Sequence, residues 1–212
     1  GHPFSSYCQK ALIALYENAT PFEFRELGLG DEATAEFAAL WPLKKMPVLV
    51  DDGRTIVEST AIIEYLAHRF PGPVQLIPTP ADDALEARML DRVFDNYIMT
   101  PMQKIVLDVL RPEDKRDAYA VQEARALLDT AYGWLDGVVT SRTWAAGESF
   151  TLADCAAAPS LFYADWAHPI AERHAHLRAY RARLLARPSF ARAVDEARRF
   201  RPFFPLGAPD RD

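Results

Sequence analysis

The spacing of apolar residues predicts several short elements in the first third of the chain. Between Cys8 and Tyr16, apolar residues recur at i, i+3, i+4, i+7 and i+8, the pattern of an amphipathic helix that ends near Glu17. Residues 21–27 alternate around two phenylalanines, as a half-buried strand does. Residues 34–40 favour a short helix.

A hairpin and another helix follow. Two apolar runs, residues 47–50 and 55–57, flank the pair Asp52-Gly53, which supplies the positive φ angles of a tight turn between strands. Residues 59–70 then return to helical spacing. The predicted order in residues 1–70 is therefore helix, strand, helix, strand, strand, helix.

This order lacks one element. The first predicted helix begins only a few residues after Gly1, whereas a parallel sheet requires a strand that leads into such a helix. We therefore expect a strand of about five residues before Gly1 in the natural protein.

A proline-rich segment separates two patterns of composition. Four of the ten residues at 71–80 are proline, which neither a helix nor a central strand accepts, so this segment is a predicted linker. From residue 81 onward, Ala, Leu and charged residues follow helical periods. We expect two domains, residues 1–70 and residues 81–212. The predicted helices of the second domain span about 81–110, 115–139, 151 onward, 174–186 and 188–200.

One of these helices has a recognisable start. Thr151 is placed to cap it, and Asp154, three residues later, completes a capping box. Capping explains both residues without a catalytic role. Pro159 lies deeper than the first turn, so we expect the helix to bend there.

Composition and charge exclude several functions. The 212 residues include 24 Lys and Arg against 30 Asp and Glu, and the net charge of −6 argues against a nucleic-acid surface. Cys8 and Cys155 are too few for a disulfide framework, which favours a reducing compartment. We expect no membrane span, because charges or prolines bound every apolar stretch. His168, His174 and His176 lack acidic or cysteine ligands at metal-site spacing, so we expect solvated surface there and no metal.

Three short segments carry candidate chemistry. Ser5-Ser6-Tyr7-Cys8 opens the first helix, where free N–H groups favour an anion such as a thiolate, although a serine cap needs no function. A cis Met46–Pro47 bond would leave the backbone of Met46 free to pair with an extended peptide, whereas a trans edge-strand proline is the common alternative. Glu58 and Ser59 precede a helix with Ser59 as its cap, and they suit the ammonium and carboxylate of an amino acid.

In this order, the three segments resemble the glutathione transferase family, and the resemblance extends through Phe150-Thr151-Leu152-Ala153-Asp154 to almost the whole chain. It implies an α+β, thioredoxin-like N-terminal domain that carries the glutathione site. An all-helical second domain would supply the pocket for an electrophile. The resemblance also implies a cytoplasmic homodimer with a detoxification role, and the missing strand would be the first, central strand of the family fold.

The resemblance assigns roles to individual residues. The backbone of Met46, next to the cis-proline Pro47, would pair with the cysteinyl unit of glutathione. Glu58 and Ser59 would hold its γ-glutamyl end. Lys45 would meet its glycine carboxylate. The common family pattern here is Asn-Pro-x-Gly-Lys-Val-Pro. In this chain, Trp41 and Lys44 stand in place of its Asn and Gly.

Ser5 falls where relatives place the activating serine or the nucleophilic cysteine. Its hydroxyl would donate to the bound thiolate and favour the charged form of the sulfur. Ser6 and Tyr7 compete for this role. Cys8 falls at the second cysteine of redox relatives and keeps a glutathione-dependent oxidoreductase or peroxidase open. A zeta-type isomerase and an inactive dimeric scaffold also remain possible. The predicted electrophile pocket lies between Phe4, the turn at residues 5–7 and the helix at residues 96–103, including Tyr97.

Overall fold

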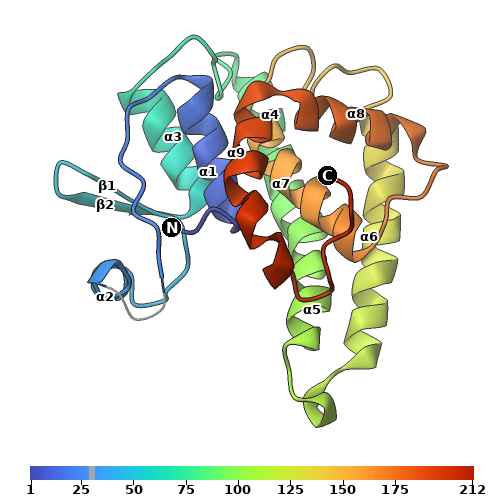
Figure 1. Cartoon of the computed structure of the whole chain (residues 1–212). Helices are drawn as coiled ribbons and strands as arrows, with labels where there is room; N and C mark the ends of the chain where they lie inside the picture. The colour runs from blue at the N-terminus through green and yellow to red at the C-terminus, as the bar shows by residue number, and fades with distance from the viewer. Residues whose placement is uncertain (29–31) are drawn as a thin grey trace.

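The computed structural model describes residues 1–28 and 32–212 (Figure 1). The N-terminal part contains helices and a small hairpin, one strand of which contacts a helix, and the helical part follows the linker. The elements of the first part are α1 (Ser6–Glu17), α2 (Glu32–Leu40), β1 (Val48–Asp51), β2 (Arg54–Val57) and α3 (Ser59–Arg69). Those of the second are α4 (Ala81–Val93), the π-helical η1 (Phe94–Met99), α5 (Thr100–Val109), the 3₁₀ turn η2 (Glu113–Lys115), α6 (Ala118–Val138), α7 (Leu152–Ala167), α8 (Ala175–Ala186), α9 (Pro188–Ala197) and the 3₁₀ turn η3 (Arg198–Phe203).

The predicted hairpin is confirmed. β1 and β2 pair antiparallel, with Val48 opposite Val57 and Asp51 opposite Arg54. Asp52 and Gly53 lie between them with φ angles of 47° and 77°. Both residues of the two-residue loop therefore have the positive φ that a type I′ turn requires.

The predicted strand at residues 21–27 is wrong: this segment is extended but belongs to no strand. Its backbone pairs with Gly1 alone among the described residues, because Gly1 donates to the carbonyl of Arg25 at 3.0 Å and accepts from Leu27 at 2.9 Å. An apolar groove of about 410 Å³ runs between this segment and β1, over α1. Without a longer ladder partner in that groove, the alternating phenylalanines Phe22 and Phe24 remain more than a third exposed.

The single helix predicted at residues 81–110 is interrupted. Its middle, η1, has π-helical hydrogen bonding, in which the N–H of Thr100 donates to the carbonyl of Asp95. The Thr100 hydroxyl donates to the same oxygen at 3.0 Å. Pro101 lacks an N–H and cannot continue an α-helical ladder, which accounts for the wide turn immediately before it.

The boundaries predicted for two later helices differ from the observed ones by a few residues. Residues 115–117 form the end of η2 and a cap, so α6 begins at Ala118, where the side chain of Asp117 accepts from Ala120 N at 2.9 Å. At the C-terminal end, α9 stops at Ala197 and continues as η3.

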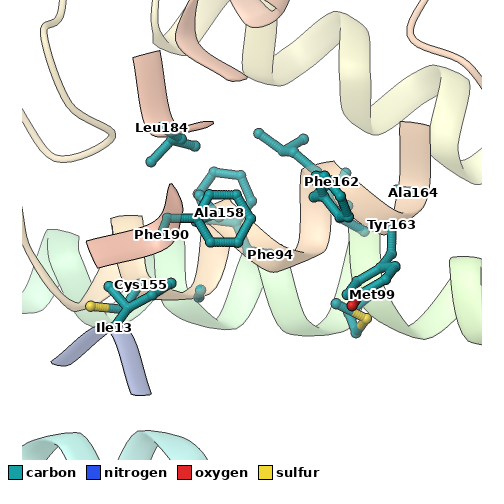
Figure 2. Packing of buried hydrophobic residues seen from close by; sticks show 14 of the residues in the cluster. Ile13, Phe94, Met99, Cys155, Ala158, Phe162, Tyr163, Ala164, Leu184 and Phe190 are labelled. Carbon is teal, nitrogen blue, oxygen red and sulfur yellow. The ribbon is translucent and has the colours of Figure 1, made fainter. Parts of the chain in front are cut away.

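Helix α7 lies at the centre of the core, and all of its residues are buried. The predicted capping box is present: Asp154 Oδ2 accepts from Thr151 N at 2.8 Å. Asp154 Oδ1 also accepts from Ala145 N at 2.8 Å and from the Tyr180 hydroxyl at 2.6 Å, so the buried carboxylate is fully bonded. The small residues of α7 allow close approach of Ile13 from α1, Phe94 from η1 and Phe190 from α9 (Figure 2).

The two parts share this core. Helix α1 packs against α3 of its own part and against α7 and α9 of the helical part. Arg187, which precedes α9, makes a two-pronged ion pair with Glu17 at the end of α1, with both distances 2.6 Å. The position of α1 is therefore fixed by both parts of the molecule. None of the described helices is long and apolar enough to cross a bilayer.

Candidate functional site

Ser5 lies at the N-terminus of α1, on the turn formed by residues 2–5. It is the N-cap, with an extended backbone (φ −81°, ψ 122°), and its Oγ accepts from Cys8 N at 3.4 Å. The N–H of Ser5 donates to the carbonyl of His2 at 3.0 Å, and the N–H of Phe4 donates to His2 Nδ1 at 3.2 Å. A hydroxyl both accepts and donates, so the cap contact leaves Ser5 able to donate its proton to an anion.

The neighbouring candidates for this role are less suitable. Ser6 is buried at 8% exposure. Burial and the nearby Asp95 carboxylate raise the pKa of Tyr7 to about 12, which keeps its phenol protonated but makes it a weaker donor to a thiolate. Tyr7 instead lies near the charges of Asp95, Arg92 and Glu58. Of the three hydroxyls, that of Ser5 fits a thiolate-stabilising role best.

Cys8 does not have the environment of a redox thiol. It is 1% exposed, and burial raises the pKa of its thiol despite opposing contacts with His2 and Ser5. A thiol that attacks a disulfide or peroxide needs access and a thiolate fraction, and burial removes both. Cys8 therefore functions in packing within the apolar face of α1.

The Met46–Pro47 peptide bond is cis, as the resemblance to the family implies. Pro47 leads directly into β1. Three residues before Pro47, Lys44 has φ 51° and its N–H donates to the carbonyl of Trp41 at 2.9 Å. Lys44 thus takes the left-handed conformation that the glycine of the family pattern favours, and the loop tolerates the replacement. Lys45 is exposed and forms no ion pair with the described residues, so its ammonium is available to a ligand.

Glu58 and Ser59 lie at the start of α3. The expectation that Ser59 caps the helix is wrong by one position: Glu58 is the N-cap, with φ 68° and ψ 118°, and it makes no side-chain cap bond. Ser59 is the first helical residue and is 5% exposed. The positive φ of Glu58 is rare for a residue with a side chain and occurs often at binding sites. Glu58 is exposed and makes no cap bond, so the first turn of α3 receives no hydrogen bond from its side chain.

A buried ionic cluster beneath this site was missed by sequence reasoning. Lys10 of α1 is 1% exposed, and its ammonium lies 2.5 Å from Asp91, 2.8 Å from Asp95 and 2.9 Å from the Thr60 hydroxyl. Arg92 pairs with the same two carboxylates from the solvent side. The available signal was a lysine among the apolar residues of the first predicted helix. The cluster joins α1, α4 and η1 to Thr60 of α3, the residue that follows Ser59.

The residues predicted to line the electrophile pocket lie on the turn before α1, on α1 itself and on η1. Tyr97 is half-exposed on η1. Phe4 instead turns toward α7 and packs edge-to-face on Tyr163, with ring centroids 5.4 Å apart. Phe4 therefore anchors the turn, and the exposed Tyr97 and the half-buried Tyr7 stay candidates for this pocket.

No cluster of three or more metal-ligating side chains occurs among the described residues. The three histidines do not share one environment. His168 lies 3.0 Å from Asp129, and His176 is exposed. The expectation of solvated surface is wrong for His174, which is buried beside Tyr132.

Comparison with known proteins identifies the class. Residues 1–74 match the family model of the glutathione S-transferase N-terminal domain, and residues 98–188 match that of the C-terminal domain. A glutathione S-transferase from Methylobacterium radiotolerans, solved with glutathione sulfonate, is 31% identical, covers 92% of each chain and superimposes with a TM-score of 0.80. This chain therefore belongs to the glutathione S-transferase family.

Two other relatives show the breadth of the family. A transferase from Methylobacillus flagellatus, solved with glutathione bound, is 25% identical over 91% of this chain and 96% of its own, with a TM-score of 0.82. FtsZ-localized protein A of Caulobacter vibrioides is 30% identical over 77% of this chain and 75% of its own length. The fold thus supports different roles among relatives.

Proposed function

We propose that this protein conjugates glutathione to a small hydrophobic electrophile. The glutathione thiol loses its proton to solvent, and the sulfur lone pair forms the new S–C bond. The leaving group departs with the electron pair of the bond that breaks. The observation that carries the proposal is Ser5 at the N-terminus of α1, where its hydroxyl and the helix dipole both favour a thiolate.

Other residues of the site bind the two charged ends and the cysteinyl unit of glutathione. Lys45 pairs with the glycine carboxylate, the backbone of Met46 beside Pro47 pairs with the cysteinyl unit, and Glu58 and Ser59 take the γ-glutamyl ammonium and carboxylate. Each charged end of glutathione then has a partner of opposite charge or a helix N-terminus. Relatives solved with glutathione or its sulfonate support this choice of ligand.

The electrophile enters from the side of Tyr7 and Tyr97, where the helical part faces the turn. Residues 1–70 form the glutathione-binding domain, residues 71–80 the linker and residues 81–212 the domain that selects the electrophile. The role is detoxification in the cytoplasm, and no metal participates. The burial of Cys8 favours conjugation over the oxidoreductase alternative.

Glutathione binding is tested by thermal melting. At about 100 times its dissociation constant, a ligand that binds only the folded state stabilises it by about 2.7 kcal/mol, so the melting temperature should rise with glutathione. A desamino analogue should produce a much smaller rise because Glu58 loses its partner. Lys45→Met should weaken the effect, whereas Lys115→Met, an exposed lysine on η2, should not. An unchanged melting temperature at millimolar glutathione would contradict the proposal.

We also propose a homodimer. Leu85 and Met89 lie four residues apart on α4 and are 66% and 49% exposed, an apolar face suited to a second copy. Light scattering at micromolar concentration should give twice the chain mass of 23.8 kDa. Replacing both residues with lysine should yield monomers, while Tyr119→Lys on α6 should leave the dimer intact. A wild-type mass near that of one chain would exclude the dimer.

A further inference from the structure

We propose that Gln9 and Tyr163 are positioning residues that fix the turn carrying Ser5. This inference rests on the proposed function of Ser5. Gln9 is fully buried in α1, and its Nε2 donates to the carbonyl of Pro3 at 3.0 Å and to the Tyr163 hydroxyl at 3.1 Å. The first bond holds the turn at Pro3, and the second connects the Gln9 side chain to α7.

The backbone of Gln9 holds the other side of Ser5. Its N–H donates to the carbonyl of Ser5 at 2.9 Å, while its side chain holds the carbonyl of Pro3, two residues earlier. Together with the bonds to His2, these contacts fix the backbone on both sides of the Ser5 hydroxyl. A shift of the turn therefore requires the buried bond from Gln9 to Pro3 and several backbone bonds around Ser5 to break.

Tyr163 connects the turn and Gln9 to the buried core around α7. It is 4% exposed on α7, and Figure 2 shows it among the buried aromatic side chains of the core. Its ring also receives the edge of Phe4, so two successive residues of the turn, Pro3 and Phe4, are attached to α7 through Tyr163. The helical part thus sets the position of a hydroxyl that belongs to the N-terminal part.

An unpaired atom of the Gln9 side chain supports this positioning role. Its Oε1 is buried and has no hydrogen-bond partner among residues 1–28 and 32–212. A buried unpaired amide oxygen destabilises a fold, and an apolar side chain of similar volume would avoid that loss. The amide is explained by what Nε2 holds rather than by packing.

The test is a double-mutant cycle with a chlorodinitrobenzene as the electrophile. Gln9→Leu should lower kcat about 10-fold with little change in KM for glutathione, because misplacement of a catalytic group affects the transition state more than binding. Tyr163→Phe, which keeps the ring against Phe4, should give a smaller loss of about 3-fold. In the Ser5→Ala background, Gln9→Leu should have almost no further effect, because Gln9 acts through Ser5. Gln75→Leu makes the same chemical change at an exposed linker position and should be silent.

A second readout does not need turnover. The ultraviolet absorbance of the bound thiolate against pH gives the pKa of bound glutathione, and Gln9→Leu and Tyr163→Phe should both raise it toward the value in Ser5→Ala. Equal losses from Gln9→Leu in both backgrounds, or an unchanged thiol pKa in both variants, would overturn the positioning role. Failure of wild-type protein to melt higher with glutathione would instead reject the proposed function itself. If Gln9→Leu does not fold, Tyr163→Phe alone decides the question.

Discussion

Ser5→Ala should lower the rate of conjugation about 10 to 1,000-fold, because one hydrogen-bond donor to a charged group contributes about 1.5 to 4 kcal/mol. The loss arises from a smaller thiolate fraction at neutral pH and should appear in kcat. Glutathione affinity should change far less, since Lys45, Glu58 and Ser59 hold the charged ends. Steady-state kinetics with varied glutathione separate the two effects.

Two controls sharpen this prediction. Cys8→Ala should leave conjugation nearly intact and lower only the free energy of unfolding, because its buried thiol packs in α1. Ser5→Cys rebuilds Cys-x-x-Cys at a helix N-terminus and should exchange conjugation for disulfide reduction. If Cys8→Ala abolishes turnover while Ser5→Ala does not, the redox alternative is correct and the conjugation mechanism is wrong.

Lys10→Met should lower the free energy of unfolding by about 3 to 5 kcal/mol, as expected when one partner of a buried ion pair is removed. Among residues 1–28 and 32–212, the variant leaves Asp91, whose side chain is 1% exposed, with Arg92 as its one charged partner. Urea denaturation monitored by tryptophan fluorescence measures the change.

The cluster offers its own control. Adding Asp91→Asn to Lys10→Met removes the buried charge that has lost its lysine partner and should restore part of the stability. Lys115→Met, which removes a lysine from an exposed ion pair, should change the unfolding free energy little. A wild-type midpoint for Lys10→Met would show that the cluster contributes nothing to stability.

Features that depend on a few neighbouring residues could be predicted from the sequence. The turn at Asp52 and Gly53 and the capping box at Thr151 and Asp154 follow from local chemistry, and both are present. The positions of Ser5 and Glu58 in the candidate site were predictable for the same reason, since each residue precedes a helix start that local spacing indicates. Their roles toward glutathione stay predictions until binding is measured.

Features that depend on distant contacts were missed or misread. The alternation at residues 21–27 correctly indicates extended backbone, but a strand needs a ladder partner, which no local pattern specifies. Lys10 meets carboxylates more than 80 positions away, and Phe4 meets an aromatic ring on α7. Nothing near either residue in the sequence indicates these partners, so neither contact was predicted.

The burial of Cys8 and Cys155 has a practical consequence. Both side chains are almost inaccessible, and burial raises the pKa of each thiol, so neither competes for maleimide dyes in the folded state. A cysteine introduced at the exposed Tyr119 position of α6 would therefore take up a fluorophore selectively, without removal of the native cysteines. Labelled protein of this kind would report encounters between two chains by energy transfer, at concentrations far below those that light scattering requires.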